Sequence, residues 1–161
     1  MAYNGIKELR AAIADRVAKA LPGVQVIQEN PWVSREMPLK KTVAVVSIDK
    51  VQTRRLALDH YLGEESREAQ QYGQGLTLGL RLELYDRNSA QNCYELFPQL
   101  CQSLMLEDFS PAPESLVCGE AAFDRAAGAF HLVCRGELRG CLGLSHPAAS
   151  LESFEIRRVT S

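Results

Sequence analysis

The stretch YGQGLTLGLRLELYDR, Tyr72–Arg87, carries leucine at every second position through its middle. The leucines are Leu76, Leu78, Leu80, Leu82 and Leu84; Gly75 precedes the first, and between them lie Thr77, Gly79, Arg81 and Glu83. A period of two places all five leucines on one face of a β-strand, whereas a helix would scatter them around its circumference. At about 3.4 Å per residue, Gln74–Arg87 spans roughly 45 Å. The stretch therefore predicts a long strand with one apolar face, extending past the core as one arm of a hairpin.

Two segments have the spacing of amphipathic helices. In the first, the apolar side chains recur at steps of three and four: Ile6, Leu9, Ile13, Val17 and Leu21. Asn4 is a candidate N-cap, and the sequence LPG predicts an end at Leu21. The second, DRNSAQNCYELFPQLCQSLML, has Ser89 as its candidate cap and Pro98 in its middle. Proline lacks a backbone N–H, so we expect Pro98 to kink this helix or divide it.

Further strands are expected on both sides of the second helix. VQVIQE and KKTVAVVSIDKV precede it, and the β-branched residues of the latter favour a strand. SLVCGEAAFD and GAFHLVCRGELRG follow as a hairpin whose turn has Gly128 available for positive φ. The tail SFEIRRVT is a candidate last strand. The chain therefore reads as an α+β fold, a mostly antiparallel sheet packed by two amphipathic helices, with a long β-hairpin.

The segment Gln52–Gln71 is the least regular part of the sequence. TRRLALDHYLG is compatible with a short helix, and EESREAQQ is polar throughout. The front is basic, with Lys50, Arg54 and Arg55, and the back is acidic, with Glu64, Glu65 and Glu68. Opposite charges at the two ends would suit a contact with a neighbouring copy of the chain.

Composition excludes several classes of protein. The formal charge is −2, which argues against a chain that mainly coats nucleic acid or an anionic membrane. No apolar run approaches the length that spans a bilayer, and the charged N-terminus does not read as a secretory signal. The five cysteines lack C-x-x-C spacing, which predicts reduced thiols and no zinc or redox motif.

Catalytic motifs are absent from the sequence, and we expect no catalytic, cofactor-binding or metal-binding residues. GQGLTLG does not have the spacing of a dinucleotide loop and lies within the alternating strand. A nucleophilic pair such as Cys134 with His60 stays open as an alternative, because partners meet in space. His131 would lie on the opposite strand face from Cys134. The Arg54–Arg55 and Arg157–Arg158 pairs read as solvated charge, and no sequence-specific nucleic-acid binding is expected.

Taken together, the order of these segments resembles the tail terminator (tail-completion) proteins of bacteriophages and prophages. The resemblance covers about Ile6–Arg139. It rests on a helix ending LPGV, then VAVVSIDKV, a segment holding LDHYLG, YGQGLTLGLRLELYDR, the helix CYELFPQLCQSL, and the hairpin GEAAFDRAAGAFHLVCRGEL. It implies a single tail-terminator-like domain over residues 1–140 and a C-terminal extension over residues 141–161.

The resemblance implies a non-enzymatic protein that assembles as a ring, commonly a hexamer. Such a ring caps the tail tube, stops its polymerisation and joins the tail to the neck, so the partners would be the tube protein and, in contractile tails, the sheath. The protein would be assembled in the bacterial cytoplasm and end in a virion or phage-tail-like particle. The candidate interface residues are Arg54, Arg55, Tyr61, Glu64, Glu65, Thr77, Arg81 and Glu83.

Three alternatives remain at this stage. The first is another connector protein of the neck or baseplate, which would share most of these features. The second is a small cytosolic enzyme that uses a cysteine–histidine pair and would contain one unusually reactive thiol. The third is a monomeric binding module, which would stay monomeric at high concentration.

Overall fold

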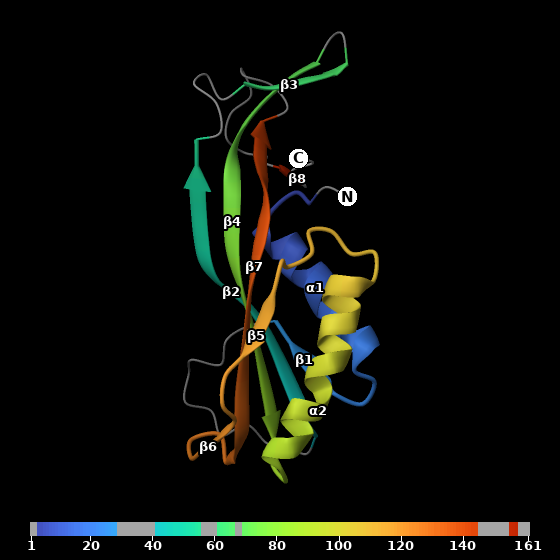
Figure 1. Cartoon of the computed structure of the whole chain (residues 1–161), viewed down its shortest axis with the longest axis vertical. Coiled ribbons are helices and arrows are strands. Elements are labelled where there is room, and N and C mark those ends of the chain that lie inside the picture. Colours follow the sequence, from blue (N-terminus) through green and yellow to red (C-terminus); the bar gives the residue numbers. More distant parts are fainter. Residues whose placement is uncertain (1–2, 29–40, 56–60, 67–68, 145–154, 158–161) are drawn as a thin grey trace.

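A computed structural model describes residues 3–28, 41–55, 61–66, 69–144 and 155–157 of the chain. Two α-helices lie on one side of a mixed, mainly antiparallel sheet, which confirms the predicted α+β class (Figure 1). In chain order the elements are α1 (Ile6–Ala20), β1 (Gln25–Ile27), β2 (Val43–Arg54), β3 (Tyr61–Ser66), β4 (Ala69–Asp86), α2 (Ala90–Cys101), the π-helical turn η1 (Gln102–Leu106), β5 (Leu116–Cys118), β6 (Ala122–Asp124), β7 (Ala129–Leu144) and β8 (Glu155–Arg157).

Strand β4 is the centre of the sheet. The order is β1-β2-β4-β7-β5, and β4 pairs antiparallel with β2 on one side and with β7 on the other. The short strands β6 and β8 also pair with β7, so the candidate last strand in the tail is confirmed. Strand β7 runs without interruption across the expected boundary between residues 140 and 141.

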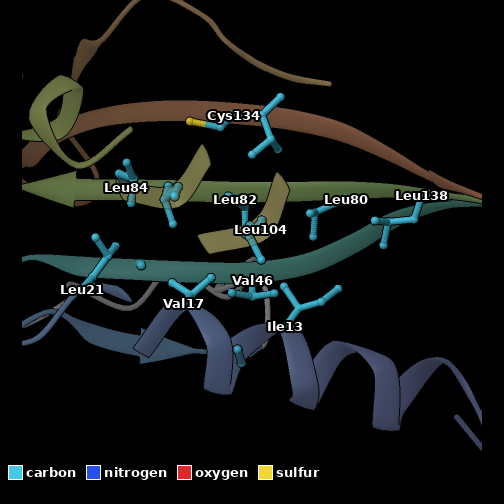
Figure 2. Close-up of a cluster of buried hydrophobic side chains, with 14 of the residues drawn as sticks. Ile13, Val17, Leu21, Val46, Leu80, Leu82, Leu84, Leu104, Cys134 and Leu138 are labelled. Atoms are coloured by element: carbon cyan, nitrogen blue, oxygen red, sulfur yellow. The ribbon is translucent and has the colours of Figure 1, made fainter. Parts of the chain in front are cut away.

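The leucine face of β4 closes the core. All five leucines are at most 3% exposed, as the alternation predicts. They pack with Leu9, Ile13, Val17 and Leu21 of α1 and its cap, with Cys93, Leu100 and Leu104 of α2 and η1, and with Ala44, Val46, Leu132, Cys134 and Leu138 of the flanking strands (Figure 2). Burying a leucine side chain stabilises the fold by about 1.5–3 kcal/mol, so this face is a major source of stability.

The ends of the helices correct one prediction and confirm another. Helix α1 starts after Gly5, not Asn4, and no side chain caps it. Asn4 instead contributes its backbone N–H, which the Glu8 carboxylate accepts at 2.7 Å. Ser89 caps α2 as predicted, its Oγ accepting the Gln91 N–H at 3.0 Å. Just before this cap, the Asp86 carboxylate accepts hydrogen bonds from the backbone N–H groups of residues 88 and 89, from the Asn92 amide and from the Thr42 hydroxyl.

Pro98 does not divide the second helix. The α-helix continues beyond it to Cys101. The chain then changes to the π-helical turn η1, which the Glu107 N–H closes by donating to the Gln102 carbonyl at 3.0 Å. The expected break is thus displaced toward the C-terminus and takes the form of a change in helix type.

The segment predicted as a helix or a polar loop contains strands. Strand β2 runs to Arg54, and β3 forms an antiparallel hairpin with the start of β4. The short helix over residues 53–63 is therefore wrong at both ends, and its middle, residues 56–60, lies outside the described residues. The second hairpin has the predicted turn: Gly128 has φ of 65°, and its N–H donates to the Asp124 carbonyl at 2.8 Å.

The leucine face can be tested by removing one side chain. Leu82→Ala should lower the free energy of unfolding by about 3–5 kcal/mol, because a 1%-exposed leucine leaves a cavity that the sheet cannot close. Leu106→Ala is the matched control: Leu106 is 80% exposed, and its loss should change stability by less than about 0.5 kcal/mol. Urea unfolding measures both, and similar losses for the two variants would contradict the assignment of the core.

Candidate interaction surface

The face of the sheet opposite the helices carries three of the candidate interface residues, Thr77, Arg81 and Glu83. On β4 it presents Thr77, Arg81, Glu83 and Tyr85. The register places His131, Arg135 and Arg139 of β7 beside them on one flank, and β2 lies on the other. This face has two parts, a closed region around Glu83 and an open, charged region around Arg139.

Glu83 is the centre of a buried polar network. Its Oε1 accepts a hydrogen bond from Arg81 Nη2 at 2.9 Å and lies 2.9 Å from His131 Nε2. The Tyr85 hydroxyl lies 3.4 Å from the same oxygen, and the Tyr85 ring stacks on the His131 ring with centroids 4.3 Å apart. Glu83 itself is only 2% exposed, and an unpaired charge at such a buried position would be costly. Arg81 of β4 and His131 of β7 provide the partners that offset this cost.

Burial and hydrogen bonding act in opposite directions on the Glu83 carboxyl. Burial favours its protonated form, but the hydrogen bonds and positive charge from His131 and Arg81 favour the carboxylate more strongly, and the pKa of Glu83 is lowered. Burial and the nearby Glu83 charge raise the pKa of the Tyr85 hydroxyl, which stays protonated and able to donate.

Arg81 and Glu83 are two of the candidate interface residues. Within this chain they pair with each other, and the Glu83 side chain is only 3% exposed. A carboxylate so enclosed has little surface for a neighbouring copy to contact. Alternation places Glu83 on the face away from the leucines, where His131 of β7 and Arg81 of β4 lie against it.

The glycines on this face also serve the chain's own packing. A Cβ atom added to Gly79 would lie 2.5 Å from Asp49 Oδ1 and 2.7 Å from Lys50 Cβ. The ladder between β2 and β4 shifts register between Ile48 and Lys50, a β-bulge that pushes Asp49 toward β4. Gly79 therefore leaves room for β2 of the same chain to approach β4 closely.

Beyond the bulge the face is exposed and rich in charge of both signs. Arg135 donates to Asp49 at 2.7 Å, Lys50 lies 3.8 Å from Glu137, and Arg139 lies 3.4 Å from Glu137. These surface ion pairs add little stability individually and leave the charges accessible to a partner.

A groove of about 490 Å³ adjoins this charged region. Arg54 and Arg139 provide its positive charge, and the negative charge comes from Glu107, Asp108 and Glu114 of the segment that follows η1. Thr77 also lines it, so two of the candidate interface residues, Arg54 and Thr77, meet at one hollow of the surface.

Strands β2 and β3 lie end to end along the same edge of β4. Strand β2 pairs with β4 from Gly75 onward, and β3 pairs with its earlier part, Ala69–Tyr72, while β7 occupies the other edge. Arg54 and Arg55 are exposed at the end of β2. Tyr61, Glu64 and Glu65 lie on β3, where only the backbone is described. The basic and acidic clusters thus share one sheet edge.

The outer side of β2 is largely unpaired. Strand β1 pairs in parallel with Val43–Val45 only. From Val46 to Arg54, no strand within the described ranges occupies the side of β2 that faces away from β4. Unpaired strand edges present free N–H and C=O groups to which another strand can bind.

The cysteine–histidine alternative gains no support from the thiols. His131 lies in the Glu83 network, whereas Cys134 points into the leucine core on the other face, as alternation predicts. Burial raises the pKa of the Cys134 thiol to about 12 and that of Cys93 to about 11, which disfavours the thiolate form of both. His60 lies outside the described residues.

Among the residues that the structure describes, no three His, Cys, Asp or Glu side chains are grouped so as to bind a metal ion. None of the helices in those ranges has the length and hydropathy that a bilayer crossing requires. No protein-family model matches the chain, and no curated protein matches its sequence.

Neutralising Glu83 should show what the network contributes. Glu83→Gln should lower the free energy of unfolding by about 2 kcal/mol at pH 7, because Arg81 and His131 lose their charged acceptor. The wild-type carboxyl has a lower pKa folded than unfolded. Its contribution is therefore complete above the unfolded value near 4.5 and is lost as pH falls through the folded value.

Urea unfolding measures this pH dependence of the free energy of unfolding. The measurements run from about pH 3 to about pH 7, a range that includes the ordinary pKa of glutamate. As pH falls, the free energy of unfolding of the wild type should decrease because Glu83 becomes protonated. Glu83→Gln should lack this part of the decrease. Glu95→Gln, on the exposed side of α2, is the matched control and should leave stability and its pH dependence nearly unchanged. Equal behaviour of the two variants would mean that Glu83 does not hold a buried ionised network.

Proposed function

We propose that the protein is a structural assembly protein of a phage tail or phage-tail-like particle. In this role copies of the chain form a closed ring, a hexamer by the resemblance noted above. The ring caps the tail tube, and the sheath where the tail is contractile, and joins it to the neck. The protein acts by binding and not by catalysis, and it works in a particle assembled in the bacterial cytoplasm.

The observation that carries the proposal is the sheet edge formed by β2 and β3. Its backbone is unpaired from Val46 to Arg54 within the described ranges, and basic residues at one end are followed by acidic residues at the other. A ring is built from heterologous contacts, in which two different patches of one chain meet. An edge with opposite charges at its two ends supplies such patches.

The shape of the chain also supports an assembly role. The β3–β4 hairpin and the ends of β2 and β7 extend past the two helices (Figure 1). A projecting sheet with one closed face and one open edge offers a neighbour a large contact area without opening the core. The bulge at Asp49 and the charge of Lys50 would restrict this edge to a matching partner, since both features discourage unspecific strand pairing.

Reversing the basic end of the edge should weaken assembly. Arg54→Glu with Arg55→Glu should shift the population toward monomer, lowering the association constant by at least about 10-fold, because like charges would then meet across the contact. Sedimentation velocity over a concentration series measures this. Arg125→Glu, at the exposed turn between β6 and β7, is the matched control and should assemble as the wild type does.

A charge swap sharpens the same experiment. Adding Glu64→Arg and Glu65→Arg to the double variant should restore assembly, because the acidic and basic ends have exchanged places. Undiminished assembly of Arg54→Glu/Arg55→Glu would count against the proposed edge. An equal loss of assembly in the control Arg125→Glu would also count against the proposed edge.

A further inference from the structure

Cys118 and Cys134 lie directly opposite each other on neighbouring strands. The register of β5 and β7 pairs them, and the adjacent Gly119 N–H donates to the Val133 carbonyl at 3.0 Å. This hydrogen bond connects the residues next to the two cysteines, not the cysteines themselves. Cys118 and Cys134 therefore occupy a non-hydrogen-bonded site of the antiparallel ladder. Cα atoms at such sites are about 4.5 Å apart, within the range of about 4.4–6.8 Å that a disulfide spans.

The two cysteines face each other across the ladder and differ in access. Cys134 is 0% exposed and points into the leucine core, where Figure 2 shows its sulfur on the inner side of β7. Cys118 is only partly buried. A small reagent therefore reaches Cys118 first, with Cys134 directly beneath it.

A third thiol borders the pair. Burial raises the pKa of Cys101, at the end of α2, and the nearby charge of Cys118 raises it further. Burial likewise raises the pKa of the Cys134 thiol. Both shifts disfavour the thiolate form, and Cys134 also lies within the core, whereas Cys101 and Cys118 pack against it. Cys118 is therefore the first of the three to be considered for attack on a small reagent.

We propose that Cys118 and Cys134 form a redox-active dithiol whose substrates are low-molecular-weight disulfides such as oxidised glutathione. The Cys118 thiolate attacks one sulfur of the small disulfide, whose S–S bond breaks, and the first thiol leaves and takes up a proton. Cys134 then releases its proton to solvent and attacks the Cys118 sulfur, which expels the second thiol. The protein dithiol is oxidised by two electrons, and the small disulfide is reduced to two thiols.

The second step is favoured by position, not by acidity. The Cys134 thiol is a weak acid, but the register places it directly opposite the mixed disulfide that it must attack. This chemistry is independent of the proposed assembly role, because neither cysteine belongs to the β2–β3 edge. The product would tie the edge strand β5 covalently to β7.

Oxidation of the native full-length protein tests this inference. The chain is incubated with oxidised glutathione at neutral pH, quenched with an alkylating reagent, and examined by intact mass spectrometry and non-reducing peptide mapping. The wild type should lose two hydrogen atoms in mass, with residues 118 and 134 in one linked peptide pair. A dithiol reductant should reverse the change.

Variants separate the two steps. Cys134→Ala should stop at a glutathione adduct on Cys118, whereas Cys118→Ser should form no link. Cys141→Ser, a partly buried cysteine elsewhere on β7, is the matched control and should form the link as the wild type does. Wild-type protein that retains glutathione on Cys118 without closing the link would overturn the inference, and so would a link from Cys118 to Cys101.

Stability gives a second readout that does not depend on the variants. The oxidised wild type should resist urea better than the reduced form, with the equilibrium constant for folding raised on the order of 100-fold by loop closure. An oxidised form less stable than the reduced one would mean that the two strands do not accommodate the bond, which would also overturn the inference.

Discussion

The structure depends on the burial of one face of β4. Five leucines from this strand meet two helices that come from distant parts of the chain, and the two flanking strands complete the same core. Because side chains alternate, a slip of one residue in the register of β4 would expose all five leucines. The leucine face thus fixes how β2 and β7 align beside β4, and through them the positions of β1, β5, β6 and β8.

Because the leucine face of the sheet is buried, only the opposite face and the strand edges remain open to a partner. Opposite the helices, the sheet is closed around Glu83 by side chains of β4 and β7, whereas beyond the Asp49 bulge it presents exposed charge. Gly79 permits that bulge by leaving room for the β2 backbone. The outer edge of β2 is left unpaired from Val46 to Arg54 by the strands in the part of the chain that the structure describes, and the assembly proposal rests on it.

The sequence predicted correctly those features that depend on a few neighbouring residues. The leucine strand, the Ser89 cap and the Gly128 turn each follow from spacing or from one residue's conformational preference. Strand β3 was missed because its sequence is polar and its strand conformation comes from pairing with β4. The Glu83 network was missed because a charged residue between leucines reads as solvent-facing, while its partner His131 lies 48 residues away. The Cys118–Cys134 pair likewise exists only through register.

Electron microscopy of the purified protein over a range of concentrations tests the central claim most directly. The claim is that β4 closes the core of each copy while the β2–β3 edge joins copies to one another. We expect closed rings of uniform size, with the β2–β3 edge of each copy against its neighbour and the leucines of β4 inside each copy. Single particles of one chain at every concentration, or rings joined through the leucine face, would contradict it.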